Sequence, residues 1–290
     1  MTQHVVLRHQ SRYRYDRPVA LGPHEIRLRP VPDCRAPVTH YALDLRPERH
    51  SMHWYGDAAG NPVARVLFPG RTPVLEIDVL LSVDLSPGNP FDFLVDPEAE
   101  RFPFEYPESA RHDLAPFLDS AENGGRLAQW LNALAAEEKP HESATVDLLI
   151  RINRRLQREI AYITRHEHGV QTVEETLAQG SGSCRDSSWL LVQILRRLGI
   201  AARFVSGYLI QLAGAPDGPK TDNADLHAWA EAYLPGAGWI GLDPTSGLLA
   251  SESHIPLARA SLPTLAAPVT GTVEPCRSEF EFSFSVQRRQ

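Results

Sequence analysis

Three residues in the second half of the chain have the types and the spacing that covalent acyl chemistry needs. Cys184 follows a glycine/serine turn, G-S-G-S, where an apolar run begins. His227 lies near the start of L-H-A-W-A-E-A-Y-L, and Asp243 ends G-W-I-G-L-D. A thiol attacks a carbonyl carbon most readily when an imidazole takes its proton and a carboxylate fixes the imidazole tautomer. The set therefore indicates acyl transfer through a thioester.

The element predicted to hold Cys184 is a helix. Apolar residues recur at helical spacing from Trp189 to Leu198, and Gly199 supplies a stop. The first turn of a helix carries unpaired N–H groups at the positive end of the helix dipole, which favours a thiolate there. Taken alone, a cysteine in this position is more simply a buried thiol that packs beneath the helix start.

His227 and Asp243 fall on two predicted strands joined by the turn P-G-A-G. In an antiparallel pair the start of one strand lies beside the end of the next, so the hairpin would place the imidazole beside the carboxylate. Considered alone, His227 is explained as an ordinary strand histidine, and Asp243 is explained as a turn cap before Pro244. The convergence of all three positions favours a site.

Other residues near these three are weaker candidates for a role in the site. Gln171 and Trp229 are candidates for an oxyanion contact or a site wall, although core or surface packing explains each as well. Arg185 is a candidate to bind a substrate carboxylate, with a surface ion pair as the alternative. Asp186 is expected to oppose the helix dipole without touching substrate. The backbone N–H of Cys184 is one expected oxyanion donor, and no second donor is assigned.

The rest of the chain predicts the frame around this set. Short alternating runs rich in aromatic and β-branched residues predict a β-rich domain over residues 1–100, either a β-sandwich or a curled sheet. The proline-rich residues 101–125 are expected to form an ordered strap, followed by a catalytic core over 126–270 with helices around Trp130 and over 146–160. Residues 253–260 and 264–269 are predicted as loops. Residues 271–290 contain a strictly alternating strand that is expected to return to the N-terminal sheet.

Composition narrows the class of protein. The 290 residues are 42% hydrophobic and 22% charged, as in a globular protein, and the formal net charge of −7 argues against nucleic-acid binding. No signal sequence or membrane-spanning stretch is evident, and three cysteines without metal-site spacing indicate a reducing cytoplasm. No cofactor or metal is expected, because the acidic clusters near Asp96 and Glu137 lack a calcium-loop pattern.

Three motifs in this chain resemble those of the bacterial transglutaminase-like cysteine hydrolases: G-S-G-S-C-R-D-S, D-L-H-A-W-A-E-A-Y-L-P and G-W-I-G-L-D-P-T-S-G. The opening R-Y-R-Y-D-R-P-V-A-L-G-P-H-E-I-R-L-R-P is similar to the β-rich region that precedes the core in that family. The resemblance implies an α+β fold, with a β-sandwich-like N-terminal domain followed by a papain-like, transglutaminase-like core. In that core the nucleophile stands at a helix N-terminus that packs on an antiparallel sheet.

The same resemblance implies roles for the three residues. Cys184 would be the nucleophile, His227 the general base and acid, and Asp243 the orienting carboxylate. A peptide or protein substrate is implied, and so are peptide-ligase-like neighbour proteins, which often accompany this family. The loop between Leu212 and Asp225 looks short for the family and borders the expected site, so substrate range is where we expect divergence.

Several activities are compatible with these residues. We expect cysteine-dependent hydrolysis of an amide, peptide or isopeptide bond. Transamidation that joins a glutamine carboxamide to an amine uses the same thioester, and acetyl transfer from a thioester donor uses the same three residues. A catalytically silent peptide-binding protein is the alternative from a different class. The sequence leaves the substrate and the oligomeric state open.

Overall fold

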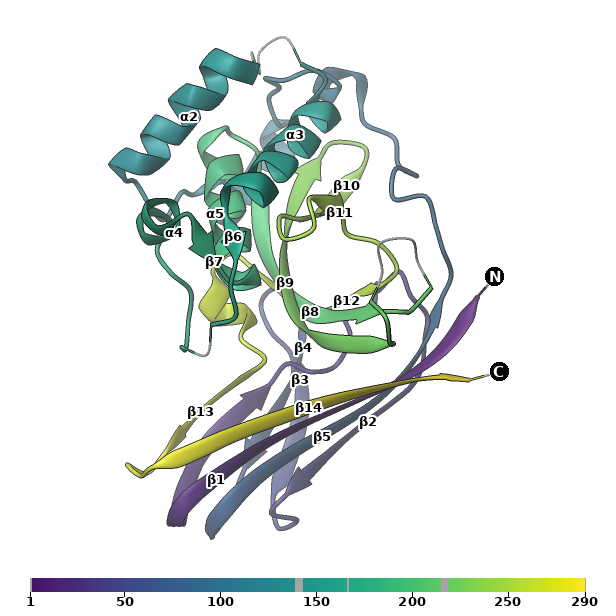
Figure 1. Ribbon diagram of the computed structural model, residues 1–290, viewed down its shortest axis with the longest axis vertical. Coiled ribbons are helices and arrows are strands. Elements are labelled where there is room, and N and C mark those ends of the chain that lie inside the picture. The colour runs from purple at the N-terminus through teal and green to yellow at the C-terminus, as the bar shows by residue number, and fades with distance from the viewer. Residues whose placement is uncertain (1, 139–142, 166, 215–218, 290) are drawn as a thin grey trace.

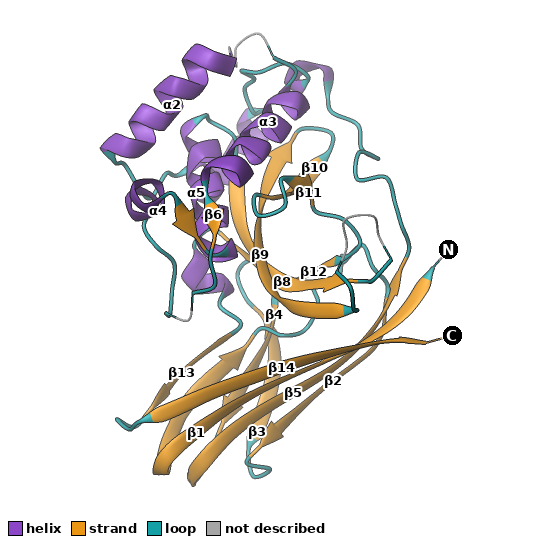
Figure 2. Ribbon diagram, viewed as in Figure 1, coloured by secondary structure: helices purple, strands orange, loops and turns teal. Residues whose placement is uncertain are grey.

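The computed structural model describes residues 2–138, 143–165, 167–214 and 219–289. In these ranges the strands form a seven-stranded sheet, a five-stranded sheet and a short two-stranded pair. Figures 1 and 2 show the larger sheet at one end of the molecule, with the five-stranded sheet and the helices at the other. No helix in the described ranges is long and apolar enough to cross a membrane.

The larger sheet is organised around one long strand, β1 (Gln3–Ile26). Its first half pairs with β5 (Arg71–Leu85) on one side and β14 (Ser278–Arg289) on the other. Its second half pairs with β4 (Pro62–Leu67) and β13 (Val269–Val273). The remaining strands of this sheet are β2 (Val38–Arg46), which pairs with β5, and β3 (Ser51–Gly56), which pairs with β4.

Of the two arrangements that the strand pattern predicted, a β-sandwich and a curled sheet, the structure contains the second. Because both halves of β1 carry partners, the described strands of the N-terminal region form one continuous sheet that curls around a shared core. The sequence predicted short strands throughout this region, whereas residues 3–26 form one strand of 24 residues. The alternating strand near the C-terminus lies antiparallel to β1 with a continuous register from His4↔Arg289 to Tyr15↔Ser278.

The five-stranded sheet is antiparallel throughout, and its order is β11-β10-β9-β8-β12. Residues 253–260, predicted as a loop, contain the whole of the edge strand β12. Pro256 suggested a loop because proline has no N–H to donate to a ladder, but an edge strand tolerates it, and the register shifts next to it. The five strands are β8 (Ala202–Gln211), β9 (Asn223–Leu234), β10 (Gly238–Asp243), β11 (Leu248–Leu249) and β12 (His254–Ala260).

The helices lie beside the five-stranded sheet, with α5 (Cys184–Arg197) against β8 and β9 (Figure 2). Almost every residue of α5 is buried. This explains why its apolar residues are not confined to a single face of the helix. The other helices are α1 (Glu108–Leu118), α2 (Gly125–Glu138), α3 (Thr145–Glu159), α4 (Val173–Gln179) and the 3₁₀ turns η1 (Pro97–Ala99) and η3 (Pro263–Ala266). The parallel pair is β6 (Ala161–Tyr162) with β7 (Ser181–Gly182).

The segment predicted as an extended strap contains the helix α1. Pro107 precedes the first turn and Pro116 lies inside the last one, so the prolines mark the ends of this helix. Their density in the sequence obscured the short helical stretch between them. The N-cap of α3 is Ala144.

The two large sheets share a core. Tyr208 of β8 is fully buried among side chains of the N-terminal sheet, and its hydroxyl lies 2.9 Å from Nδ1 of His9. Asn61, also buried, binds the edge of β12: its Nδ2 donates to the carbonyl of Arg259, and its Oδ1 accepts from the Arg259 N–H, each at 2.8 Å. The N-terminal sheet therefore supports the strand β12 directly.

Candidate active site

Cys184 is the first residue of α5 and is 9% exposed. The short strand β7 and the residue Ser183 lead into the helix, and both the N–H and the hydroxyl of Ser183 donate to Oδ2 of Asp186. This contact closes the first turn of the helix around the thiol. The backbone N–H groups of a first turn have no partner within the helix and can receive a developing negative charge.

His227 and Asp243 meet across the hairpin of β9 and β10. Nε2 of His227 lies 3.2 Å from Oδ2 of Asp243, and both side chains are buried. Burial alone would raise the pKa of Asp243, but the hydrogen bonds from His227 and His254 hold it well below its usual value. Because Asp243 stays ionised, the pair favours a protonated His227.

Cys184 and His227 also interact. Burial alone would lower the pKa of His227, but hydrogen bonds with Asp243 and with Cys184 outweigh it and raise this pKa to about 10. Since Nε2 of the ring is directed at Asp243, Nδ1 is the nitrogen left for the thiol. The arrangement stabilises a protonated His227 between the carboxylate of Asp243 and the sulfur of Cys184.

The carboxylate of Asp243 is held by a set of short-range donors from the turn that follows β10. Oδ1 accepts from the N–H of Thr245 at 2.9 Å and from its hydroxyl at 2.5 Å. Oδ2 accepts from the hydroxyl of Ser246 at 2.9 Å. The backbone carbonyl of Asp243 accepts from Nδ2 of Asn153 on α3, which ties the turn to that helix. Asp243 is thus fixed in orientation as well as in charge.

A second histidine, His254, reaches the same carboxylate. Its Nε2 lies 3.5 Å from Oδ2 of Asp243, and its ring packs edge-on against Trp229. The sequence interpretation missed His254 because it placed residues 253–260 in a loop. The available signal was the run H-I-P-L-A, which has the length and apolar character of a buried strand if proline is allowed at its edge.

One group of side chains in the described ranges is close enough to share a metal ion: His227, Asp243 and His254, whose ligand atoms lie within 4.8 Å of one another. The hydrogen bonds of His254 indicate that one of these ligand atoms carries a proton. Nδ1 of His254 accepts from the N–H of Ser251 at 3.2 Å, so the neutral ring carries its proton on Nε2, the atom that faces Asp243. A nitrogen that carries a proton is not available to a metal.

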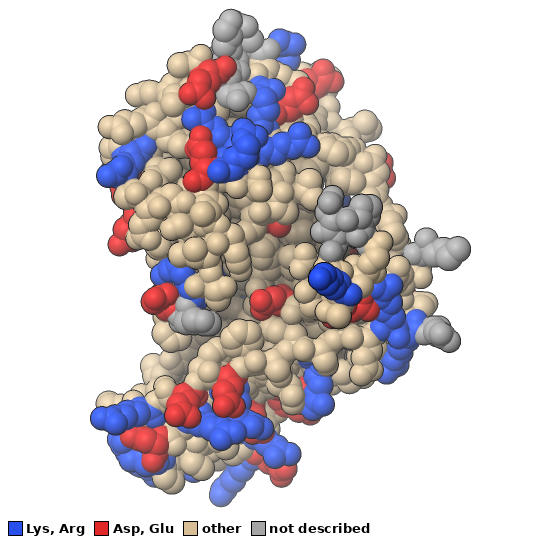
Figure 3. All heavy atoms as spheres, viewed as in Figure 1, with Lys and Arg blue, Asp and Glu red and all other residues tan. Residues whose placement is uncertain are grey.

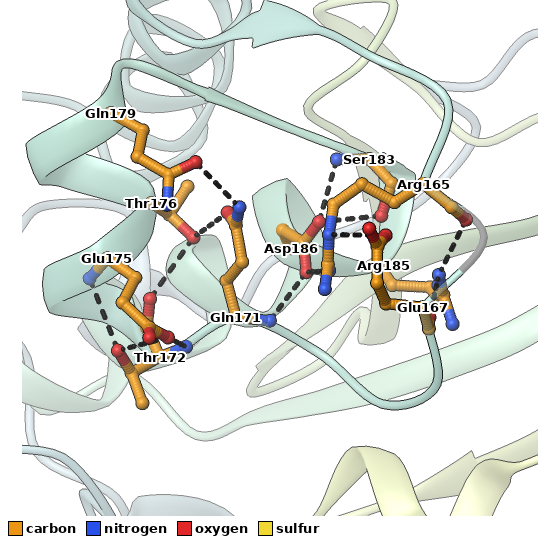
Figure 4. A network of polar contacts seen from close by, with 10 residues as sticks. All are labelled: Arg165, Glu167, Gln171, Thr172, Glu175, Thr176, Gln179, Ser183, Arg185 and Asp186. Carbon is orange, nitrogen blue, oxygen red and sulfur yellow. Dashed lines mark hydrogen bonds and ion pairs between the residues drawn. The ribbon is translucent and has the colours of Figure 1, made fainter.

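Trp229 and Gln171, the two candidates for a site wall or an oxyanion contact, differ in placement. Trp229 is buried on the same face of β9 as His227, with the two rings roughly parallel and 6.4 Å apart, so it forms a wall behind the imidazole. The carboxamide of Gln171 instead bonds to Thr176 and Gln179 of α4 (Figure 4). These contacts give Gln171 a role in holding α4.

Arg185 and Asp186 lie in the same network of Figure 4. The guanidinium of Arg185 donates to the carbonyls of Arg165 and Glu167, so it holds the segment before Gln171. Among the described residues, Arg185 forms no ion pair with an acid. Asp186 is buried and accepts from Arg165 at 2.6 Å and from the Gln171 N–H at 2.7 Å. Its role is to anchor the start of α5.

The mouth of the site carries exposed apolar side chains. Tyr162 of β6 is 57% exposed, and its pKa is raised by partial burial and then by the negative charges of Cys184 and Asp225. Leu248 of β11, which pairs with Asp243, is 60% exposed. Part of the loop between Leu212 and Asp225 (residues 215–218) lies outside the described residues, so the predicted divergence there stays a prediction.

Comparisons with known proteins agree with this arrangement. Residues 5–84 match the bacterial transglutaminase-like N-terminal region, and residues 132–244 match the transglutaminase-like superfamily core. An uncharacterised protein of Mycobacterium tuberculosis is 25% identical over 276 residues, which cover 91% of this chain and 86% of the relative. A protein-glutamine gamma-glutamyltransferase of Pseudomonas aeruginosa is 38% identical over 66 residues, 22% of this chain and 10% of that enzyme.

The same fold is present in the crystal structure of a candidate cysteine protease from Cytophaga hutchinsonii. It aligns with 100% of this chain and 92% of its own, with a TM-score of 0.73 and 17% identity. The class is therefore a mixed helix-and-sheet, transglutaminase-like fold with a strand-rich N-terminal region. This chain belongs to the bacterial transglutaminase-like family.

Proposed function

We propose that this protein is a cysteine-dependent amide hydrolase with Cys184 as nucleophile, His227 as general base and acid, and Asp243 as the carboxylate that orients His227. The observation that carries the proposal is the position of His227, which hydrogen-bonds to Asp243 and to Cys184 at the start of α5. The family membership of the chain supports the same reading. Peptide and isopeptide bonds are the proposed substrates, since both present an amide carbonyl to the thiol.

In the acylation step, Sγ of Cys184 attacks the amide carbonyl carbon, and the carbonyl electron pair moves to oxygen. The backbone N–H of Cys184 is the proposed donor to this oxyanion. As the carbon–nitrogen bond breaks, His227 gives its proton to the departing nitrogen. The products of this step are a free amine and a thioester on Cys184.

In the deacylation step, water attacks the thioester carbonyl while His227, now neutral, takes one proton from the water. The carbon–sulfur bond then breaks, which releases a carboxylic acid and returns the thiolate beside an imidazolium. Asp243 keeps its charge throughout and stabilises the imidazolium at the start and at the end of the cycle.

Transamidation is the second candidate activity. It differs only in the acceptor, because an amine in place of water attacks the thioester and forms a new amide. The observation that favours it is the short similarity to the glutamyltransferase of Pseudomonas aeruginosa, over 66 residues. The exposed Tyr162 and Leu248 at the mouth of the site give an acceptor side chain an apolar surface to contact.

The test is incubation of the protein with a peptide library, with and without a fluorescent primary amine, followed by mass spectrometry. Hydrolysis would appear as cleaved peptides or as carboxamides converted to acids, and transamidation as peptides that carry the amine. Cys184→Ala is the control and should form neither product. Release of coenzyme A from an acetyl thioester is measured in parallel to detect acetyl transfer.

Two results would contradict the proposal. Products that persist in Cys184→Ala would place the chemistry elsewhere. Alkylation of Cys184 with the pH dependence of an ordinary thiol, near pKa 8.5, together with no product in any assay, would favour the catalytically silent peptide-binding protein.

A further inference from the structure

We propose that His254 is a positioning residue that shares the Asp243 carboxylate with His227 and limits how tightly His227 holds its proton. This inference rests on the proposed function of Cys184, His227 and Asp243. It assigns a task to a side chain that no sequence motif of the site contains.

The geometry defines what His254 can do. It lies on β12, next to β8, and its side chain is 8% exposed. Its Nε2 and the Nε2 of His227 approach the same oxygen, Oδ2 of Asp243, at 3.5 and 3.2 Å. The rings of both histidines contact Trp229, one stacked and one edge-on, so their orientations are set by one buried side chain.

The tautomer of His254 follows from its second nitrogen. A backbone N–H can only donate, and that of Ser251 lies 3.2 Å from Nδ1 of His254. Nδ1 must therefore be the unprotonated nitrogen, and Nε2 carries the hydrogen toward Asp243. The hydroxyl of Ser253 lies 3.4 Å from the same Nδ1. His254 is consequently a neutral donor to the carboxylate, at the long end of hydrogen-bond distance.

This donor matters most when His227 is neutral. After His227 gives its proton to a leaving nitrogen, Asp243 is a buried carboxylate without a cationic partner, and the N–H of His254 remains to stabilise its charge. A donor that stabilises this state relative to the imidazolium makes proton release from His227 easier. Removal of the donor should therefore make His227 more basic, not less.

Other groups face His227 and must stay constant in any test. Cys184 faces it from α5, Asp243 and the hydroxyl of Thr245 from the end of β10 and the turn after it, and Asp225 from β9 itself. Tyr162 lies near Cys184 and Asp243 at the mouth of the site. None of these is altered by a substitution at His254, so a change in the titration of His227 reports on the shared carboxylate.

The experiment measures the rate at which iodoacetate alkylates Cys184 in the full-length protein as a function of pH, by mass spectrometry of the peptide that contains Cys184. An anionic reagent reacts best with a thiolate beside an imidazolium, so the rate falls on the alkaline side as His227 loses its proton. His254→Phe keeps an aromatic ring and removes the donor, and His254→Gln keeps a donor of similar reach. His24→Gln, a change at a buried histidine of β1, is the matched control.

We expect the alkaline limb to move to higher pH by about 0.5–1 unit in His254→Phe, while the acid limb stays in place. In His254→Gln and His24→Gln the alkaline limb should stay near that of the unmodified protein. Circular dichroism verifies the fold of each variant, and His254→Met replaces His254→Phe if the latter does not fold.

An alkaline limb that stays in place in His254→Phe, moves downward, or moves equally in His254→Phe and His254→Gln would overturn the inference. The assay needs no substrate, so it is independent of whether an amide substrate is found. If the unmodified protein shows no alkaline limb at all, Cys184 and His227 do not form an ion pair and the proposed function fails instead.

Discussion

At the scale of single residues, the three cysteines of this chain have the same side chain but different surroundings, and the surroundings decide how reactive each thiol is. Cys184 lies at the start of α5 beside His227, whereas burial raises the pKa of Cys34 and no acid–base partner is assigned to it. Reactivity of a thiol follows from the population of its thiolate and from access. One cysteine should therefore dominate both labelling and catalysis.

The first prediction compares the cysteines. Cys184→Ala should lower turnover of a peptide substrate by about 10³-fold or more, since a lost nucleophile removes the whole covalent route. Cys34→Ala and Cys276→Ala should leave turnover within about twofold, because single surface or half-buried changes seldom exceed a fraction of a kcal/mol. Steady-state rates with one peptide identified from the library supply the measurement. Equal losses in all three variants would point to a general loss of fold.

The second prediction concerns the pH dependence of stability. The folded pKa of His227 is raised to about 10, so its contribution to stability is complete below its unfolded pKa of about 6.5 and disappears as the pH rises toward 10. The folded pKa of Asp243 is depressed, so its contribution is present above about 4 and disappears on acidification. The pair therefore stabilises the fold most between about pH 4 and pH 6.5.

The corresponding measurement is the thermal unfolding midpoint of the protein and of His227→Gln across pH. The difference between the two should be largest between about pH 5 and 6 and should shrink steadily toward pH 10. A difference that grows with pH would mean that His227 is neutral in the folded protein at neutral pH.

At the scale of elements, sequence patterns predicted the helix and the hairpin of the site, because each of them is formed by one continuous segment of the chain. The helix at Cys184 and the hairpin that joins His227 to Asp243 follow from periodicity and from one turn, and the structure contains both elements. Strand β12 and helix α1 escaped prediction, because proline penalises both types locally while long-range packing stabilises them. His254 was missed for the same reason, since its partner is reached only through the tertiary fold.

The third prediction addresses the anchor at the start of α5. Asp186→Asn should destabilise the protein by about 3–5 kcal/mol, because it leaves the largely buried Arg165 with only the more distant and exposed Glu167 as its anion. Arg165→Met in the same background should recover part of this loss, as in a double-mutant cycle. Glu175→Gln, at the exposed capping box of α4, is the control and should cost far less. Urea unfolding provides the free energies, and additive losses would show that Asp186 and Arg165 do not interact.

The fourth prediction uses a glycine of β8, the strand of the five-stranded sheet that lies between β9 and the edge strand β12. A Cβ on Gly207 would lie 2.3 Å from the carbonyl oxygen of Ile255 and 2.5 Å from the ring of Trp229, the wall behind His227. Gly207→Ala should therefore destabilise the protein by about 3 kcal/mol and slow alkylation of Cys184, as overpacking forces strands apart. Gly70→Ala, where a Cβ meets open space, should do neither. Equal stability of the two variants by urea unfolding would argue against this packing.

At the scale of the whole molecule, the N-terminal sheet does more than precede the catalytic elements. Its outer face mixes both signs of charge, with pairs such as Arg8–Asp78 and Arg12–Glu76, and Figure 3 shows the two signs side by side over that end of the molecule. Its inner face packs on Tyr208, and its residue Asn61 bonds to the edge of β12. The sequence patterns predicted the strands of this sheet but not that support, because it comes from side chains such as Asn61 and Asp33, which reach Arg259 only in the folded chain.

The fifth prediction tests this support. Asn61→Asp replaces the amide that donates to the Arg259 carbonyl with an oxygen that repels it, in a position that is 1% exposed. We expect a loss of about 3 kcal/mol in the free energy of unfolding. Asn89→Asp, where the side-chain oxygen accepts from the Phe91 N–H in either residue, should be neutral. If both variants unfold at the same urea concentration, β12 does not depend on the N-terminal sheet.

The pairing of β1 with β14 has a consequence for the time course of biosynthesis. β1 is translated before the catalytic elements, yet the partner on one of its sides, residues 278–289, is translated after all of them. During translation, the edge of β1 that pairs with β14 therefore stays open until residues 278–289 have emerged. A chain stalled before residue 278 would carry Cys184, His227, Asp243 and His254 but would present an unfinished sheet to chaperones and proteases.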